Sequence, residues 1–578
     1  MATTLVSPGV LAIENDQSFI TQNPIAVGAA IIGPTVKGLV NIPTICTSYS
    51  DYQAKFGTTF TSASQVYTYF TSIAAYNYFL NGGQTLLVSR VVSGSFTSAT
   101  ALDGVTGNPV ISSSVGSGSL VITTLSQGII MNSSSSLDVS GSLPSGSSNN
   151  IRWQIQNANT SSGTFDLLVR RGNDSTNNPV VLETWTNLSL DPFAGNYVAA
   201  VIGDYTTNYN SVTNQIDISG SYANRSAYIR ISQVVNPTPH YLDNNSAPQS
   251  QYVGFIPANG SGSFGGATGN LFTNGQTAFY NQITSGTNPN YIQGIPSSSY
   301  DGMIALMSNS DAYKFNIMLA PGLIDSLQPS ETTTIINNTQ NRGDNLFVLD
   351  LVPYGTSIST TVSQALSKNT SYAASYWPWC QTKDPDSGQN VWVPASTMVG
   401  GVYAYTDKVS DPWFAPAGIN RGGLSTVIRA EQKLSQANRD TLYSNKVNPI
   451  ATFPGNGVVV YGQKTLQTQS SSLDRVNVRR LLIALKSYIS QVAQNLVFEQ
   501  NTQATRNQFL SQVNPYLASV QQQQGLYAFK VIMDDSNNTP DVIDRNQLVG
   551  QIYIQPTKTA EFIYLDFNIL PTGAVFPA

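Results

Sequence analysis

Hydrophobic positions near the end of the chain repeat with the period of an α-helix. They are spaced four, three, four, three and four residues apart: Val478, Leu482, Leu485, Ile489, Val492 and Leu496. At about 100° per residue these side chains share one face. The opposite face carries Arg479, Arg480 and Lys486, and Ile483 is its one apolar member. The pattern predicts an amphipathic helix that packs through one face and presents basic side chains on the other.

A second helix and three strands are predicted after this one. The helix ends near Gln524, where Gly525 is placed to stop it. The strands are "LYAFKVI", "LVGQIYI" and "AEFIYLDFNIL". In the last strand the alternate positions that share a face are Ile563, Leu565, Phe567 and Ile569. We expect a helix-helix-β-β-β module whose small sheet has open edges, and an open edge recruits further strands.

The first part of the chain alternates strand and helix patterns. "PIAVGAAIIGP" predicts a buried strand, "SYSDYQAKFG" a helix that begins at a Ser or Asp cap, and "QTLLVSRVV" another strand. Ser-, Gly- and Thr-rich sequence with short β-branched runs follows, and the α/β pattern returns at "DGMIALMSNSDAYKFNIMLAPG" and "NLFVLDLVP". The simplest interpretation is one α/β core that is split by a long all-β insertion.

The fold class predicted for the 578 residues is therefore mixed α/β (α+β) and multidomain, because the chain is too long for one core. A short alternating strand near the start belongs to no local core: Val10, Leu11, Ala12 and Ile13. The predicted boundaries are an N-terminal arm 1–20, core 21–92, β-rich insertions 93–160 and 161–300, core 301–455, C-terminal domain 456–560, and a C-terminal strand and arm 561–578.

Composition points to assembly. Hydrophobic residues make up 41% of the chain, but charged residues only 10%, against a typical value of about 25%. A net charge of −5 offers no basic patch for nucleic acid, and a weakly charged exterior does little to repel a second copy. No apolar run approaches the roughly 18 residues of a membrane span, and we expect no secretory signal at the start. Cys46 and Cys380 are expected to be free buried thiols.

The stretch "TFPGNGVVVYGQKTL", residues 452–466, almost matches a phosphate-binding loop but has one extra residue, Gln463. A phosphate loop needs its Gly-Lys-Thr at the start of a helix. Here Val-Val-Val-Tyr lies between Gly457 and Gly462 and favours an extended chain. We interpret the stretch as a buried strand between glycine turns. A nucleotide-driven enzyme, with Asp350 as magnesium partner, is the alternative.

Other candidate chemistry is weak. Residues 384–390, "DPDSGQN", begin like a calcium loop but lack its third acidic position and closing Glu, which favours a tight turn. The single histidine, His240, lies in a Pro- and Asn-rich loop without an orienting partner. No His/Cys cluster with zinc-ligand spacing occurs. We therefore predict no enzyme activity, no metal and no cofactor. The basic helix face is either solvated or binds an acidic partner.

Six sequence blocks, in order, resemble one family. They are "SPGVLAIEN", "VGAAIIGPTVKGLVNIPTICTSYSDYQAKFG", "YFLNGGQTLLVSRV", "SYWPWCQTKDPDSGQNVWVPASTMVGGVYAYTDKVSDPWFAPAG", "VNPIATFPGNGVVVYGQKTL" and "VNVRRLLIALKSYISQVAQNLVFEQNTQATRNQF". The chain is identified by these blocks as similar to the contractile tail sheath proteins of myovirus-type bacteriophages. Tyr461 departs from the usual Trp of the family pattern, and Ala395 from a Pro.

The resemblance implies a structural subunit of the virion, assembled in the host cytoplasm. Such subunits stack as hexameric rings around a tail tube and contract to drive the tube through the host envelope. The implied partners are copies of the chain, the tail tube protein, and the baseplate and tail terminator proteins. Terminal arms of neighbouring subunits would add strands to the C-terminal sheet, through residues 10–13 and the last strand. The face of Arg479, Arg480 and Lys486 is our hypothesis for tube contact.

Two alternatives remain open. A β-rich phage adhesin would share the Ser/Thr/Asn-rich composition, but it should carry its β-domain at one end of the chain. A secretion-system or bacteriocin sheath would share the blocks quoted above, although the long insertion favours a phage.

Overall fold

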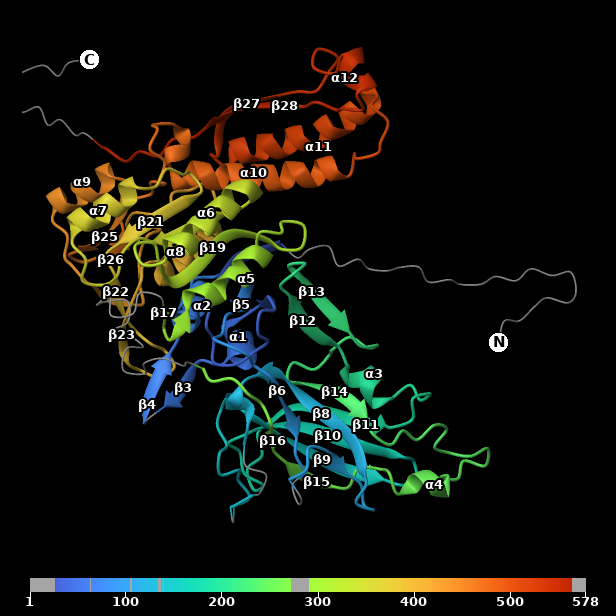
Figure 1. Cartoon of the computed structure of the whole chain (residues 1–578). Coiled ribbons are helices and arrows are strands. Elements are labelled where there is room, and N and C mark those ends of the chain that lie inside the picture. Colours follow the sequence, from blue (N-terminus) through green and yellow to red (C-terminus); the bar gives the residue numbers. More distant parts are fainter. Residues whose placement is uncertain are drawn as a thin grey trace, which may run out of the picture.

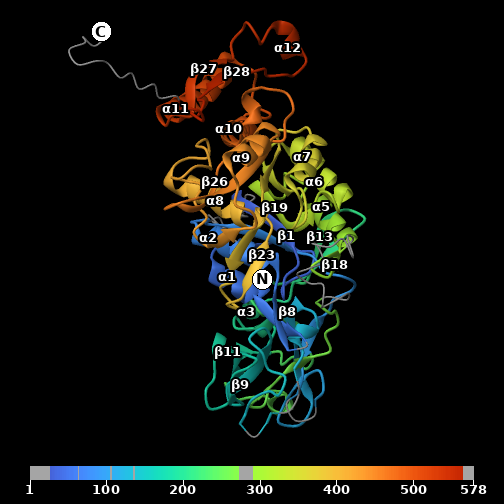
Figure 2. The same ribbon diagram turned by 90° about the vertical axis from the view of Figure 1, so that its left-hand side faces the viewer.

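The structure, a computed structural model, describes residues 26–62, 64–103, 107–133, 137–138, 140–271 and 291–563. Three parts lie in a row along an elongated molecule (Figures 1 and 2). The C-terminal module lies at one end, an α/β core in the middle, and a β-rich insertion at the other end. The mixed α/β class predicted from the sequence is confirmed.

An eight-stranded sheet forms the core. Its strands, in spatial order, are β2 (Thr44–Cys46), β5 (Leu86–Arg90), β1 (Ala26–Gly33), β19 (Lys314–Ile324), β20 (Leu346–Asp350), β21 (Ala373–Trp377), β25 (Val447–Phe453) and β26 (Gly457–Val460). The six inner strands are parallel, and the two edge strands are antiparallel to their neighbours. Because β1 pairs directly with β19, residues from both sides of the insertion build one sheet.

Helices cover both faces of this sheet, because successive side chains of a buried strand point to opposite faces. Ile31 of β1 belongs to the apolar cluster on one face, and Ile32 to the cluster on the other. The first face is covered by α1 (Tyr49–Phe56), α2 (Phe70–Leu80) and α8 (Ser396–Val409). The second is covered by α5 (Asp301–Leu306), α6 (Pro329–Arg342), α7 (Ile358–Leu366) and α9 (Gln436–Ser444). Helix α1 begins at Ser48, one of the two predicted caps, whose Oγ accepts from the Asp51 N–H.

Small sheets decorate the core. They are the hairpin β3 (Thr59–Ser62)–β4 (Gln65–Thr68), the pair β17 (Tyr291–Ile292)–β18 (Ile295–Pro296), and a three-stranded sheet of β22 (Cys380–Lys383), β23 (Asn390–Val393) and β24 (Val427–Ala430). Single 3₁₀ turns are η1 (Ile129–Met131), η3 (Ser297–Tyr300) and η4 (Ser472–Asp474).

The insertion is a β-sandwich. One sheet contains β6 (Ser98–Ala101), β7 (Ile111–Ser112), β8 (Gly118–Gln127), β14 (Ile229–Val234) and β16 (Phe264–Gly265). The other contains β9 (Ile151–Asn159), β10 (Thr164–Arg171), β11 (Val181–Ser189) and β15 (Gly260–Gly262). Side chains of both sheets share a single apolar core. The boundary predicted at 160/161 is wrong, because it cuts the turn between the paired strands β9 and β10.

A hairpin of the insertion reaches back to the core. It is formed by β12 (Thr206–Asn210) and β13 (Gln215–Ser219), between the short helices α3 (Val198–Ile202) and α4 (Ser250–Val253). Tyr209 and Ile216 of this hairpin pack against the core cluster that includes Met303. The insertion is therefore fixed to the core at a second place, beyond its two connecting segments.

The C-terminal module contains α10 (Val476–Gln494), α11 (Gln503–Gln522), β27 (Leu526–Ile532), α12 (Pro540–Asp544) and β28 (Gln551–Pro556). Both predicted helices and the first two strands are confirmed. The predicted third strand is wrong where the structure describes it, since residues 560–563 have no strand conformation. Leu565, Phe567 and Ile569 lie outside the described residues, as do residues 10–13.

Two details of the module differ from the sequence prediction. Helix α11 ends at a left-handed residue, but this is Gln524 (φ 64°) and not Gly525. Gly525 is required for close approach, because a Cβ there would lie 2.6 Å from Cγ1 of Val520. The boundary predicted at 455/456 is also wrong, because it cuts the hairpin of β25 and β26 in the core sheet.

Helix α10 is buried on two flanks. Leu481, Leu485 and Val492 pack with α11 in the apolar cluster of the module. Val476 and Ile483 belong instead to the cluster on the first face of the core sheet. The apolar exception on the predicted polar face, Ile483, is thus one of the contacts that join the module to the core.

Candidate assembly interface

The two-stranded sheet of β27 and β28 is the open sheet of the module. Phe529 of β27 and Ile554 of β28 face each other and pack on the module cluster. On the solvent side, Tyr527 and Tyr553 are 62% and 55% exposed. Within the described residues each strand has only the other as partner, so each presents an outer edge whose backbone groups can pair with another chain.

The chain leaves this sheet through an extended segment, residues 557–563, that is held at Glu561. Arg475, the residue before α10, donates from Nε and Nη2 to the two carboxylate oxygens, at 2.7 and 3.0 Å. Gln463 donates from Nε2 to Glu561 at 3.1 Å and to Thr559 at 2.6 Å. We call this group, with the Tyr443 hydroxyl that also bonds Glu561, the tail clamp.

Charge and burial have opposite effects on the pKa of Glu561 in the tail clamp. Burial raises the pKa of Glu561, but the Arg475 guanidinium and the donors of Gln463 and Tyr443 outweigh it and hold that pKa below its usual value. Both side chains of the ion pair are about one-quarter exposed or less. A two-pronged, charge-assisted contact of this kind fixes orientation as well as position.

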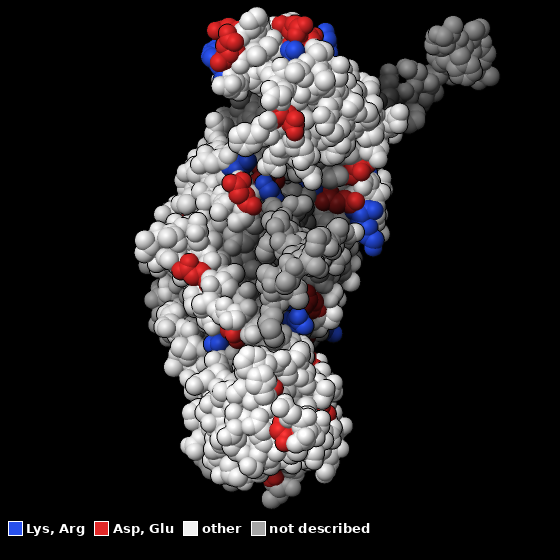
Figure 3. Space-filling view, turned by 90° about the vertical axis from the view of Figure 1, so that its right-hand side faces the viewer, with Lys and Arg blue, Asp and Glu red and all other residues white. Residues whose placement is uncertain are grey.

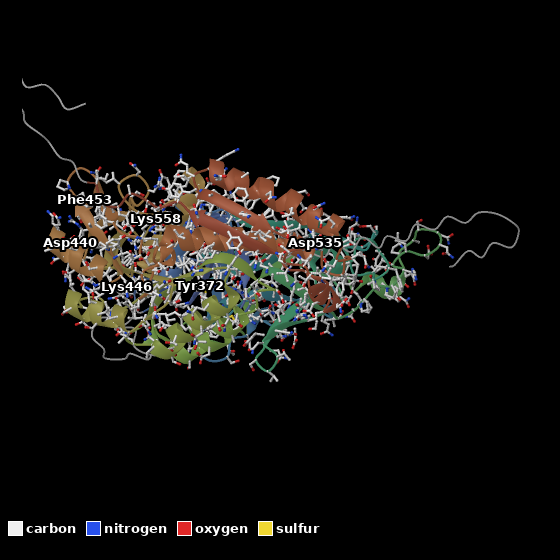
Figure 4. All side chains as sticks on the ribbon, turned by 90° about the horizontal axis from the view of Figure 1, so that it is seen from above. Tyr372, Asp440, Lys446, Phe453, Asp535 and Lys558 are labelled. Carbon is white, nitrogen blue, oxygen red and sulfur yellow. The ribbon has the colours of Figure 1, made fainter. Side chains whose placement is uncertain are left out.

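Grooves flank the clamped segment on both sides. One, of about 640 Å³, lies towards the start of α10 and includes Ser472, Asn477 and Val478. The other, of about 520 Å³, lies towards α9 and includes Arg439, Asp440 and Tyr461. Figure 4 shows Lys558 of the segment on the same side of the molecule as Asp440 and Phe453, with Asp535 at the opposite end of the module.

The segment then presents apolar side chains. Phe562 and Ile563 are 70% and 76% exposed. They follow directly on the tail clamp and lie beside unfilled grooves, so a strand or an apolar side chain of another molecule has both backbone and side-chain contacts to gain here. This arrangement favours assembly over catalysis.

The predicted basic face of α10 faces the core and not a free surface. Arg480 is 2% exposed and pairs with Asp407 at 2.6 Å. Arg479 is 4% exposed, donates to Ser371 and lies over the Tyr372 ring at 4.0 Å.

Lys486 is exposed, but it too is directed at the core. Its Nζ lies 3.8 Å from where a Cβ on Gly343 would stand, at the end of α6. The prediction of an exposed three-residue basic surface is therefore wrong for Arg479 and Arg480. The core covers Arg479 and Arg480, so neither solvent nor another molecule is in contact with most of their surface.

The stretch that resembles a phosphate loop contains the buried strand β26, as predicted from the sequence, and this strand pairs with β25 in a hairpin. Gly457, with φ 71°, closes the turn into β26. Lys464 donates from Nζ to the Tyr443 carbonyl at 2.8 Å, and Thr465 donates to the Leu473 carbonyl at 2.9 Å. Gln463, the extra residue, belongs to the tail clamp. No sequence signal linked Gln463 or Arg475 to Glu561, since the contacts span 98 and 86 residues.

The remaining sequence candidates have structural roles. Asp384 accepts from backbone N–H groups of its own turn, which contains Gly388 at φ 72°. His240 stacks on Phe193, with ring centroids 4.6 Å apart. Cys46 and Cys380 are free and buried as predicted, and burial raises the pKa of each thiol to about 12.

In the described ranges, no group of three His, Cys, Asp or Glu side chains is arranged to hold a metal ion. Nor does any helix in those ranges combine the length and the apolar character that a bilayer span requires. Figure 3 shows one face of the molecule, on which most side chains are uncharged; the charged ones gather at the end of the module that carries α12 and again across the middle.

Comparison with known proteins places this site in a family. Residues 287–466 match the phage tail sheath protein central domain, and residues 468–570 match the phage tail sheath C-terminal domain. Two phage tail sheath domains therefore lie in this chain. The tail clamp joins the two sheath domains, because Gln463 lies in the first match and Arg475 and Glu561 lie in the second. The junction of the matches, at 466/468, also corrects our predicted boundary at 455/456.

Individual sheath proteins resemble parts of the chain. The tail sheath protein of Vibrio phage KVP40 is 41% identical over 40% of this chain, and that of Enterobacteria phage T4 is 37% identical over 39%. The matches cover 35% and 34% of those proteins, so the chain spans about a third of the length of these relatives. Among solved structures, the sheath tail protein Lin1278 of Listeria innocua aligns over 92% of this chain and 95% of its own, with 10% identity and a TM-score of 0.49.

Proposed function

We propose that this sheath-family chain is the structural subunit of a contractile phage tail sheath, and that it polymerises around the tail tube as stacked hexameric rings. The observation that carries the proposal is the open β27–β28 sheet beside a clamped, apolar-ended segment, in a chain that matches both sheath domains. A subunit built for a polymer needs unsatisfied strand edges and a fixed exit for the connecting chain. Both are present in the module.

Neighbouring subunits would be joined by exchanged strands. Residues 10–13 of one subunit and residues 563–569 of another would add to the β27–β28 sheet of a third. Each main-chain hydrogen bond contributes about 1 kcal/mol net, so one added strand stabilises a link by a few kcal/mol. Contacts that run head to tail without closing produce a helix, which is the symmetry of a sheath.

Contraction would be a switch between two packings of the same subunits. The extended form would be kinetically trapped, and the contracted form lower in free energy. The free energy released would drive the tube through the host envelope, without nucleotide or cofactor. The partners would be the tail tube, baseplate and tail terminator proteins, and the site of action the virion, after assembly in the host cytoplasm.

The position of the insertion favours a sheath over an adhesin. An adhesin is expected to carry its β-domain at one end of the chain, whereas here the sandwich interrupts the core between β5 and β19. The sheath of a related contractile injection system is the nearest alternative function, and the long insertion favours a phage.

Negative-stain microscopy of the purified chain tests the proposal. We expect tubes or rings from the full chain, and soluble monomers from a variant that lacks residues 1–14. A control that replaces Val10, Leu11, Ala12 and Ile13 with different strand-favouring residues should still polymerise, because strand addition uses the backbone. A full chain that stays monomeric at high concentration, or a truncated chain that polymerises normally, would overturn the proposal.

A further inference from the structure

A groove of about 380 Å³ separates the C-terminal module from the amino ends of β1 and β19. One wall is α10, from which Ile483, Ala484, Ser487, Tyr488 and Gln491 line it. The other wall includes Gly28 of β1, the first residues of β19, and Pro412. The groove lies where the module meets the core.

Two buried polar atoms at this groove have no hydrogen-bond partner. Arg480 lines the groove and is 2% exposed; its Nη2 holds Asp407, but its Nη1 is unpaired. Asn316 also lines the groove, and its Oδ1 is buried and unpaired. A buried polar group without a partner is unfavourable, so an added partner is favoured. One donor and one acceptor left open together match the carbonyl and N–H groups of an extended peptide backbone.

The chain itself enters the fold at this groove. The described residues begin with Ala26, which pairs with Lys314, and Lys314 and Gly28 both line the groove. The preceding residues are "ITQNPI", 20–25. Pro24 biases Asn23 towards an extended backbone. An extended residue advances about 3.3 Å, so the three residues before Ala26 span at most about 10 Å, a length that can reach the groove.

We propose that residues 20–25 of the chain's own N-terminal segment occupy this groove. Their backbone would accept from Arg480 Nη1 and donate to Asn316 Oδ1, and Ile20 or Ile25 would lie on the apolar surface of Ile483 and Ala484. The part of the N-terminal segment that directly precedes β1 would then be held between the core and the module. This contact lies within one chain, so a test of it is independent of strand exchange between chains.

Disulfide trapping in the full chain tests this contact. The variant carries Asn23→Cys and Ser487→Cys; Ser487 is exposed on α10. Oxidation at low protein concentration should give a monomer with an internal disulfide, detected by its mobility on a non-reducing gel and by peptide mass. A second pair, Gln22→Cys with Gln491→Cys, repeats the test should the first variant fold poorly.

The matched control pairs Asn23→Cys with Ser359→Cys on α7. Helix α7 packs near β25, four strands from β1, a separation of about 19 Å at about 4.8 Å per strand. We expect the groove pair to form its internal bond at least about tenfold faster than the control, because a seated thiol has a high effective concentration. Equal rates would overturn the proposal. Disulfide-linked dimers as the main product would assign the groove to the segment of a second copy and would overturn it as well.

Discussion

The two buried arginines of α10 show how one side chain can serve two domains. Arg480 comes from the module, but its carboxylate partner Asp407 and the Tyr403 ring, 4.8 Å from its guanidinium carbon, belong to α8 of the core. Tyr403 in turn shares a 2.6 Å hydrogen bond with Tyr376 of β21. A charge placed in the interior is stabilising only while each of these partners is present.

Replacing Asp407 with Asn should therefore destabilise the fold. The change leaves Arg480 buried without a counter-charge, and because Asp407 is itself 28% exposed we expect a loss of about 2–3 kcal/mol in the free energy of unfolding. Urea unfolding measures it. Lys486→Met on the same helix is the matched control and should cost less than about 1 kcal/mol. Equal effects of the two variants would mean that the ion pair does not join module to core.

A second residue-scale prediction concerns pH. Burial raises the pKa of Asp350 to about 7, although hydrogen bonds from Ser396 and Gly322 act in the opposite direction. The folded state therefore binds this proton more tightly than the unfolded state, whose carboxyl titrates near 3.8. Stability contributed by this group must fall as pH rises from about 4 to about 7, and change no further above that.

Asp350→Asn isolates this effect. Relative to the variant, the natural chain should lose unfolding free energy across that pH range, with a slope of at most about 1.4 kcal/mol per pH unit. Unfolding measured in urea at several pH values checks the difference. A difference that is constant from pH 4 to pH 8 would show that Asp350 is ionised throughout.

At the residue scale, the sequence predicted structural roles that depend on neighbouring residues in the chain. It did not predict roles that depend on partners far away in the sequence. The Ser48 cap and the two free cysteines follow from short patterns and composition. Arg480 and Glu561 were unpredictable as partners of other residues, because their neighbours lie 73 and 86 or more positions away. The charge pattern of one helix does not reveal that a second domain covers it.

At the scale of elements, the tail clamp decides how the last part of the chain is held. Residues 557–563 have no strand partner among the described residues. One backbone bond, from Thr557 to Gly525 at 3.1 Å, and the side-chain bonds of Thr559 and Glu561 hold them. The segment therefore depends on side chains where a strand would depend on backbone pairing.

Glu561→Gln should loosen this segment. The variant keeps one acceptor but loses the charge that Arg475 pairs with, and a partly exposed, two-pronged contact of this type contributes about 1–2 kcal/mol. Tryptic cleavage after Lys558 should become about 5- to 30-fold faster, because the open state is more populated. Mass spectrometry of the released C-terminal peptide measures the rate.

Glu499→Gln, in the α10–α11 loop, is the control and should leave that rate unchanged. The same protection should depend on pH. Since the pKa of Glu561 is held below 4.5, protection is complete above that pH and is lost as pH falls through the lowered value. A segment that is cleaved equally fast in the natural chain and in Glu561→Gln would show that other contacts hold it.

Helices and buried strands were the elements most reliably predicted. The 3.6-residue period of α10 and the continuous apolar run of β1 are strong local signals. The predicted strand at 560–563 was wrong because alternation gives a side-chain pattern, whereas a strand also needs a neighbour to pair with. Among the residues that the structure describes this neighbour is missing, and under the proposed function it belongs to another subunit.

At the scale of the molecule, the insertion is joined to the core at a narrow crossing. Thr97 and Thr268 lie side by side there, with a 3.1 Å bond from the Thr97 N–H to the Thr268 carbonyl and a 3.0 Å contact between their hydroxyls. Because entry and exit are adjacent, the sandwich can be absent without opening a gap in the core, and chain connectivity alone does not require it.

Removal of residues 98–267, with Thr97 joined to Thr268 through two glycines, should leave a folded core and module. The cost is local: Arg90 loses the Gln127 carbonyl that accepts from its Nη1, and the cluster under Tyr209 becomes exposed. We expect cooperative unfolding at a lower temperature, measured by circular dichroism. A chain that fails to unfold cooperatively would show that the sandwich is part of the core's folding unit.

At the scale of the molecule, the fold class predicted from the sequence was correct, but two of the predicted domain boundaries were wrong. Composition separated the Ser- and Thr-rich insertion from the α/β core, because a sandwich with solvated faces needs polar turns and a buried sheet does not. The boundaries at 160/161 and 455/456 failed, since each cuts a hairpin. A turn between paired strands and a linker between domains have the same local composition.

The place of the tail clamp has a mechanical consequence. Tension on the C-terminal segment would otherwise reach β28 first and peel its short ladder one hydrogen bond at a time. Because Glu561 is paired with Arg475, at the amino end of α10, the force is transmitted to that helix before it reaches β28. Helix α10 packs against the module on one flank and against the core on the other. Force on the C-terminal segment is therefore distributed as shear over both of these interfaces.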